Sequence, residues 1–101
     1  MRISVQERDL VISGAERSYV EDRLALTLGR FSAQIAKVAV TLSSAAVGTG
    51  GLEKRCRIDV GLRPETIHVE DEDTDLRTAL DRATGRLART LARALERGGR
   101  S

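Results

Sequence analysis

The stretch DLRTALDRATGRLARTLARALERGGR, residues 75–100, contains seven arginines but only two acids after Asp75. When it is plotted as a helix at about 100° per residue, its apolar side chains fall within about 60° of one line. The stripe consists of Leu76, Leu80, Ala83, Leu87, Leu91 and Ala94. The pattern predicts a long amphipathic helix that begins near Thr74 or Asp75 and ends near Glu96, where Gly98 and Gly99 follow as stop signals.

The same plot places a column of arginines on the outer flank of this helix, between about 220° and 300°. The column consists of Arg82, Arg86, Arg89, Arg93 and Arg97, and no acid lies inside it. Like charges at these spacings repel by roughly a few tenths of a kcal/mol per pair. One interpretation is a solvated face in a chain where 15 of 17 basic residues are arginine. The other is a row of cations that binds phosphate and whose affinity falls steeply with salt.

A run of acids precedes the helix: residues 64–75 hold six carboxylates and no lysine or arginine. We expect Asp71, Glu72, Asp73 and Asp75 to lie around the N-terminus of the helix, where acids cap free N–H groups and complement the helix dipole. A metal site would need convergent ligands, which one short run does not establish. A second possible role of the acidic run is to repel RNA, which would fix which end of the helix approaches the RNA.

Outward from this helix, alternating apolar and polar residues predict strands at 2–8, 37–43, 54–62 and 66–71. Ser13 and Glu16 form a capping box, which predicts a helix from there to about Gly29. The glycine-rich residues 43–53 predict a flexible loop. The order is β-α-β-β-β-α, an α+β fold with a four-stranded sheet and two helices packed on one face. The open sheet face then carries Lys37, Arg55 and Arg57.

Length and composition bound the function. The 101 residues form a single domain, 1–101, with 41% hydrophobic and 2% aromatic residues and a net charge of +2. The low aromatic content argues against base stacking on single strands and favours contact with folded RNA through phosphates. The lone Cys56 and the absence of a signal or membrane segment predict a cytoplasmic protein.

Catalytic and ligand-binding motifs are missing from the sequence. Cys56 alternates with core residues and is expected to pack, whereas the only histidine, His68, is expected on the other face of the sheet. There is no phosphate-binding glycine loop, no paired Cys/His spacing and no triad. We therefore expect no enzyme activity, no metal, no cofactor, no small-molecule substrate and no membrane partner.

Both helices match a known family in register. The last helix matches at Ala79, Leu80, Asp81, Arg86, Leu87, Arg89 and Leu91, and the first helix at Ala15, Tyr19, Val20, Arg23, Leu24 and Phe31. On these residues the chain resembles the ribosome hibernation-promoting factors, also called ribosome-associated translation inhibitors, in their short form. Two departures mark a divergent branch: Leu26 stands where members usually have lysine, and Arg77 where they usually have an aromatic residue.

The resemblance implies a protein that binds the small ribosomal subunit through rRNA and blocks the mRNA and tRNA channel in stress or stationary phase. The candidate RNA-binding residues are Arg82, Arg86, Arg89, Arg93, Arg23, Lys37, Arg55 and Arg57. Two alternatives stay open. One is a protein-interaction or self-associating module of the same fold, in which the acidic run of one copy faces the arginine column of another in a homodimer. The other is a general binder of double-stranded RNA.

Overall fold

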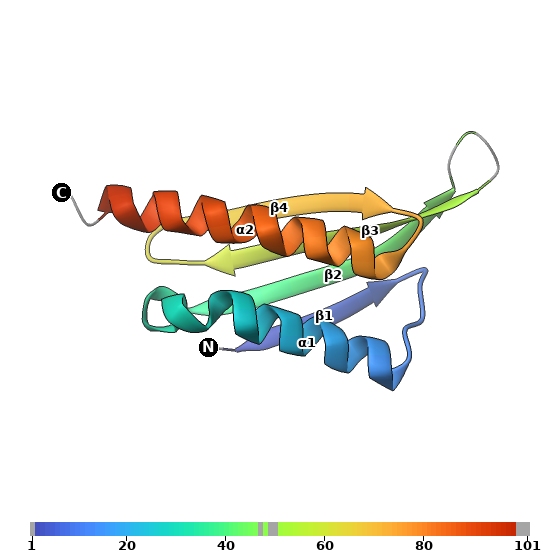
Figure 1. Cartoon of the computed structure of the whole chain (residues 1–101), viewed down its shortest axis with the longest axis horizontal. Helices are drawn as coiled ribbons and strands as arrows, with labels where there is room; N and C mark the ends of the chain where they lie inside the picture. The colour runs from blue at the N-terminus through green and yellow to red at the C-terminus, as the bar shows by residue number, and fades with distance from the viewer. Residues whose placement is uncertain (1, 47, 49–50, 99–101) are drawn as a thin grey trace.

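The computed structural model describes residues 2–46, 48 and 51–98 as two layers, a sheet covered on one side by two helices (Figure 1). In chain order the elements are β1 (Ile3–Arg8), α1 (Gly14–Leu28), the 3₁₀ helix η1 (Gly29–Gln34), β2 (Lys37–Ala46), β3 (Leu52–Gly61), β4 (Thr66–Asp73) and α2 (Leu76–Gly98). The predicted α+β fold of β-α-β-β-β-α order, with both helices on one face, is confirmed.

The strands lie in the order β1-β2-β3-β4. β1 and β2 are parallel, with α1 as the crossover between them, and the other two pairs are antiparallel. The register places Val38 opposite Val60, and Val60 opposite Ile67. Because side chains alternate between the faces of a sheet, this register gathers the apolar residues of all four strands on the helix-facing side.

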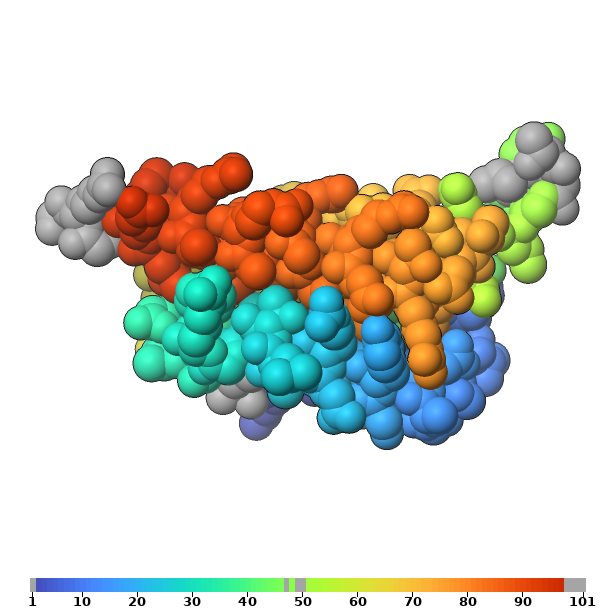
Figure 2. Space-filling view, in the orientation of Figure 1, coloured from blue at the N-terminus to red at the C-terminus, as the bar shows by residue number. Residues whose placement is uncertain are grey.

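The core lies between the sheet and the two helices. Leu24 and Leu28 of α1 and Leu80, Leu87 and Leu91 of α2 are fully buried there. α2 packs on β3 and β4 and also contacts α1, and Figure 2 shows the two helices side by side over the sheet. The apolar stripe read from the sequence is therefore the surface that fixes the rotation of α2 about its own axis.

Cys56 and His68 lie where the alternation predicts. Cys56 is fully buried among core residues, and its burial, with a smaller effect of the nearby Asp71 carboxylate, raises the pKa of the thiol to about 12. A thiol with this pKa is not a nucleophile at neutral pH. His68 is exposed and lies opposite Asp59 in the β3–β4 register.

The capping box of α1 forms as predicted. The Ser13 hydroxyl accepts a hydrogen bond from the Glu16 N–H at 3.1 Å, and the Glu16 carboxylate accepts one from the Ser13 N–H at 3.0 Å. The bond to the Ser13 backbone is the main reason why the pKa of Glu16 is lowered. The helix ends at Leu28 as expected, but Gly29 stays right-handed and starts η1. Gly29 therefore changes the type of helix rather than reversing the chain.

The strands around the β2–β3 connection are longer than the sequence indicates. β2 continues to Ala46 and β3 begins at Leu52, so most of the expected loop at 43–53 is paired strand. Residues 47, 49 and 50 of that prediction lie outside the described part of the chain. β4 likewise continues to Asp73, two residues beyond its expected end, so all of the acidic run except Asp75 belongs to a strand.

Replacing Ser13 with alanine should lower the free energy of unfolding by about 1 kcal/mol, because the Glu16 N–H at the start of α1 loses the hydroxyl that accepts its hydrogen bond. Urea denaturation followed by circular dichroism measures this change. Ser18→Ala, at an exposed position inside α1, is the matched control and should change stability much less. Equal effects of the two substitutions would contradict a stabilising role for the capping box.

Candidate nucleic-acid interface

The arginine column of α2 forms as the helical spacing predicts. Arg82, Arg86, Arg89, Arg93 and Arg97 are all exposed. They lie on the flank away from the buried Ala83, Leu87 and Leu91. Because these core residues hold α2 in one rotation, the guanidinium groups are presented along one side of the helix.

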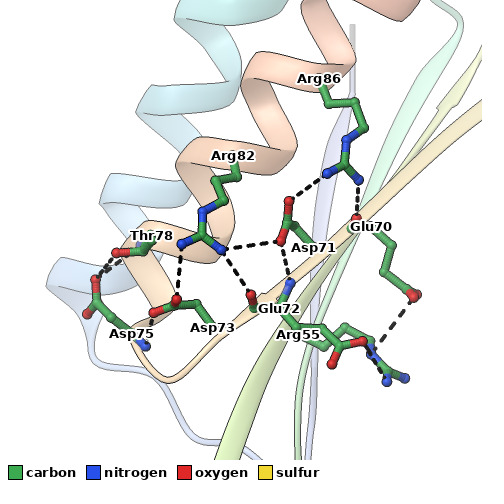
Figure 3. Close-up of polar contacts among 9 residues, drawn as sticks. All are labelled: Arg55, Glu70, Asp71, Glu72, Asp73, Asp75, Thr78, Arg82 and Arg86. Atoms are coloured by element: carbon green, nitrogen blue, oxygen red, sulfur yellow. Dashed lines mark hydrogen bonds and ion pairs between the residues drawn. The ribbon is translucent and has the colours of Figure 1, made fainter.

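The N-terminal half of the column is already paired, contrary to the expectation of an unneutralised row (Figure 3). Arg86 donates to the Asp71 carboxylate at 2.8 Å and to the Glu70 carbonyl at 2.7 Å. Arg82 donates to the Asp73 carboxylate at 3.3 Å and to the Glu72 carbonyl at 3.4 Å. The prediction failed because the acids come from β4, a neighbour in space that the helical plot does not include.

The placement of the acidic run was also wrong in part. Asp71, Glu72 and Asp73 lie in β4, and of these Asp73 still accepts a hydrogen bond from the Asp75 N–H at 2.8 Å, just before α2 begins. Asp75 does cap the helix: its carboxylate accepts bonds from the Thr78 N–H at 3.1 Å and from the Thr78 hydroxyl at 2.8 Å. These bonds lower the pKa of Asp75. The capping role therefore belongs to the last acid of the run.

The C-terminal half of the column carries free charge. Within residues 2–46, 48 and 51–98, no carboxylate forms an ion pair with Arg89 or Arg93. Both side chains are exposed on the outer flank of α2. They are one helical turn apart, so they can contact neighbouring phosphates of one polyanion.

Arg23 lies between the two helices. Its Nε is 3.3 Å from an Asp81 oxygen, which also accepts a hydrogen bond from the Tyr19 hydroxyl at 2.9 Å. The contact is an ion pair without a hydrogen bond: the buried Nε of Arg23 has no hydrogen-bond partner among the described residues. The Arg77 guanidinium covers the Tyr19 ring at 4.5 Å. Arg23 thus joins α1 to α2 while part of its side chain stays exposed.

A shallow groove of about 380 Å³ runs along this junction. Its lining consists of Arg23, Leu26, Thr27, Arg30, Thr84, Gly85 and Ala88. Arg30 was not among the residues selected from the sequence, although it follows Arg23 by seven positions, two helical turns, and so returns to the same face. Its guanidinium lies over the Phe31 ring at 4.5 Å. The groove therefore adds one more cation to the helix-bearing surface.

Lys37, Arg55 and Arg57 are exposed, and their strand positions place them on the open sheet face, away from the helices. Arg55 pairs with Glu72 at 2.9 Å, and Arg57 pairs with Asp59 at 3.2 Å. A hydrogen bond to Glu72 raises the pKa of Glu53 beside them. The eight selected residues therefore divide between two opposite surfaces, and only the helix-bearing one carries the arginine column.

The described residues contain no group of three or more His, Cys, Asp or Glu side chains that could hold a metal ion. Among the described helices, none is both long and apolar enough to cross a membrane. The selected residues on the helix-bearing surface and on the open sheet face carry positive charge and hydrogen-bond donors.

A family model described as Sigma 54 modulation protein / S30EA ribosomal protein matches residues 3–98. The chain belongs to this family. The match confirms the resemblance to ribosome hibernation factors that the two helices indicated. Comparison with curated proteins gives no match.

Two solved structures share the fold over nearly the whole chain. The crystal structure of the Thermus thermophilus Protein Y N-terminal domain is 35% identical, with a TM-score of 0.73, and the alignment covers 92% of this chain and 98% of that one. A ribosomal subunit interface protein from Coxiella burnetii has a TM-score of 0.78 at 21% identity, with 95% and 99% covered. At that identity, the second likeness concerns the fold alone.

The single tyrosine reports on the junction between the helices. Hydrogen bonding to Asp81, with smaller effects of desolvation and of the Asp81 charge, raises the pKa of Tyr19 above 10.0. Asp81→Asn should lower this pKa, because the phenolate no longer forms beside a carboxylate. With one tyrosine and no tryptophan in the chain, ultraviolet absorbance during an alkaline titration measures the midpoint. Asp22→Asn, at an exposed position of α1, should leave it unchanged, and an equal shift in both variants would contradict the contact.

Proposed function

We propose that this protein binds the small ribosomal subunit through arginines of its helix-bearing surface that contact rRNA, and that it inhibits translation by occluding the channel for mRNA and tRNA. Membership of the S30EA ribosomal protein family and the likeness to Protein Y support ribosome binding. The observation that carries the choice of surface is the pair Arg89 and Arg93, which are exposed on α2 without a carboxylate partner in the described part of the chain.

The chemistry of this pair suits phosphate. A guanidinium presents several donors in a plane and binds two phosphate oxygens at once, and it remains charged at every physiological pH. Neutralising phosphates releases counterions, so binding of this kind weakens steeply as salt rises. Arg23 and Arg30 at the inter-helix groove extend the cationic surface toward α1. With few aromatic rings in the chain, we assign recognition to the shape and backbone of folded rRNA.

Occlusion is a steric mechanism and uses no bond-making step. The protein is a thin, elongated body of 49 × 28 × 18 Å whose helices and sheet form one packed unit. A rigid body held by phosphate contacts excludes other ligands from the space that it fills. We propose that this body, held by Arg89 and Arg93, keeps mRNA and tRNA out, so that inhibition follows from occupancy alone.

Replacing Arg89 and Arg93 together with glutamate should reduce affinity for small ribosomal subunits by about a hundredfold or more, since two phosphate contacts are lost and two repulsions are added. Cosedimentation at physiological salt measures this loss, and circular dichroism checks the fold. Arg2→Glu with Arg8→Glu makes the same change in charge and should retain binding, because both residues are exposed and alternate with the core-facing Ile3 and Val5, which places them on the open face of the sheet. Unchanged cosedimentation of the α2 variant would contradict the proposed surface.

The two alternatives make different predictions for the same preparations. A self-associating module should show a mass that rises with concentration and no affinity for ribosomes. The ion pairs of Arg82 and Arg86 within their own chain do not favour either reading, because they occupy both the acids that a second copy would contact and two of the arginines selected as rRNA contacts. A general binder of double-stranded RNA should be displaced from ribosomes by an arbitrary duplex at comparable phosphate concentration, whereas a ribosome-specific protein should remain bound.

A further inference from the structure

The outer edge of β4 is covered by side chains of the same chain. β4 is the last strand in the sheet order, and such an edge exposes unpaired N–H and C=O groups to other strands. Here Arg86 donates to the Glu70 carbonyl and Arg82 to the Glu72 carbonyl. The Glu72 N–H donates to the Asp71 carboxylate at 2.8 Å. Figure 3 shows these bonds as a row along the strand.

Asp71 is at the centre of this arrangement. One of its oxygens accepts the Glu72 N–H and lies 3.7 Å from Arg82, while the other accepts from Arg86 at 2.8 Å. Its side chain is only 13% exposed, whereas the two arginines are about half exposed. One carboxylate thus contacts both guanidiniums and a backbone donor, and its low exposure reduces the screening of these charges by water.

Alternation along β4 explains why Asp71 and not its neighbours takes this position. Asp71 lies opposite Cys56 and therefore on the helix-facing side of the sheet, under α2. Glu70 and Glu72 point to the other face, where both approach Arg55. Only the odd-numbered acids of the run can reach the arginine column with their side chains.

We infer that Asp71 is a positioning residue that, together with Asp73, commits Arg86 and Arg82 to the edge of β4, so that the anion-binding part of the column is Arg89 and Arg93. For Arg82 or Arg86 to bind phosphate, it must first release a carboxylate and a backbone carbonyl, whereas Arg89 and Arg93 have no ion pair to break among the described residues. The inference rests on the proposed function in naming rRNA as the anion. The division of the column applies to any polyanion.

The decisive test is Asp71→Asn, which keeps an oxygen for the Glu72 N–H but removes the charge paired with Arg86, while Arg82 keeps its bond to Asp73. Binding to a short RNA duplex of arbitrary sequence is measured at several salt concentrations. We expect affinity to rise and the salt dependence to steepen by about one unit of slope, because the Arg86 guanidinium becomes available to a phosphate. Asp22→Asn has the same change in net charge and should show a smaller rise and no steepening.

If Asp71→Asn and Asp22→Asn have the same affinity and slope, net charge alone explains the result and the inference is overturned. A second comparison does not depend on the folding of the Asp71 variant. Arg82→Gln with Arg86→Gln should retain most duplex affinity, while Arg89→Gln with Arg93→Gln should lose about tenfold or more. Equal losses in the two double variants would also overturn the inference. Because the probe is a duplex, failure of the ribosome assignment shows separately, as loss of cosedimentation with small subunits.

Discussion

The packing of the apolar stripe of α2 on the sheet is the constraint on which the rest of the structure depends. Leu80, Leu87 and Leu91 are fully buried, and burying a leucine side chain stabilises a fold by about 1.5–3 kcal/mol. No other rotation of α2 keeps these residues in the core. The rotation of α2 therefore fixes the side of the helix from which the arginine side chains project. That side lies beside the edge of β4.

The ion pairs of that flank follow from a match between two repeats. Four residues of a helix rise about 6 Å, and two residues of a strand rise about 6.7 Å. Arg82 and Arg86 are four apart, and their partners Asp73 and Asp71 are two apart in the opposite direction. The next step of the column passes residues 67–69, which contain no carboxylate. The change from paired to free arginine thus occurs where the acidic run ends.

Local periodicity was enough to predict the layers of this fold. It was not enough to predict which residues of one element lie beside which residues of another. The order of elements, the capping box at Ser13, the burial of Cys56 and the face of His68 all depend on neighbours in sequence, and all were predicted. The end of β4 was misjudged because acids are uncommon in strands, and residues 71–75 resemble a turn. That error removed Glu72 and Asp73 from the sheet, and with Asp73 the partner of Arg82. Arg30 was missed although its spacing from Arg23 contained the signal.

The free half of the column retains an unfavourable interaction in the isolated protein. Arg89 and Arg93 are like charges at a spacing that costs an exposed helix about 0.2–0.5 kcal/mol, and among the described residues no ion pair with a carboxylate forms at either of them. At Arg82 and Arg86 the same repulsion is offset by Asp71 and Asp73. A polyanion would supply at Arg89 and Arg93 what β4 supplies at the other half. The acids that cover the sheet edge end there, so one turn further along α2 lies the pair of arginines to which we assign the binding of the anion.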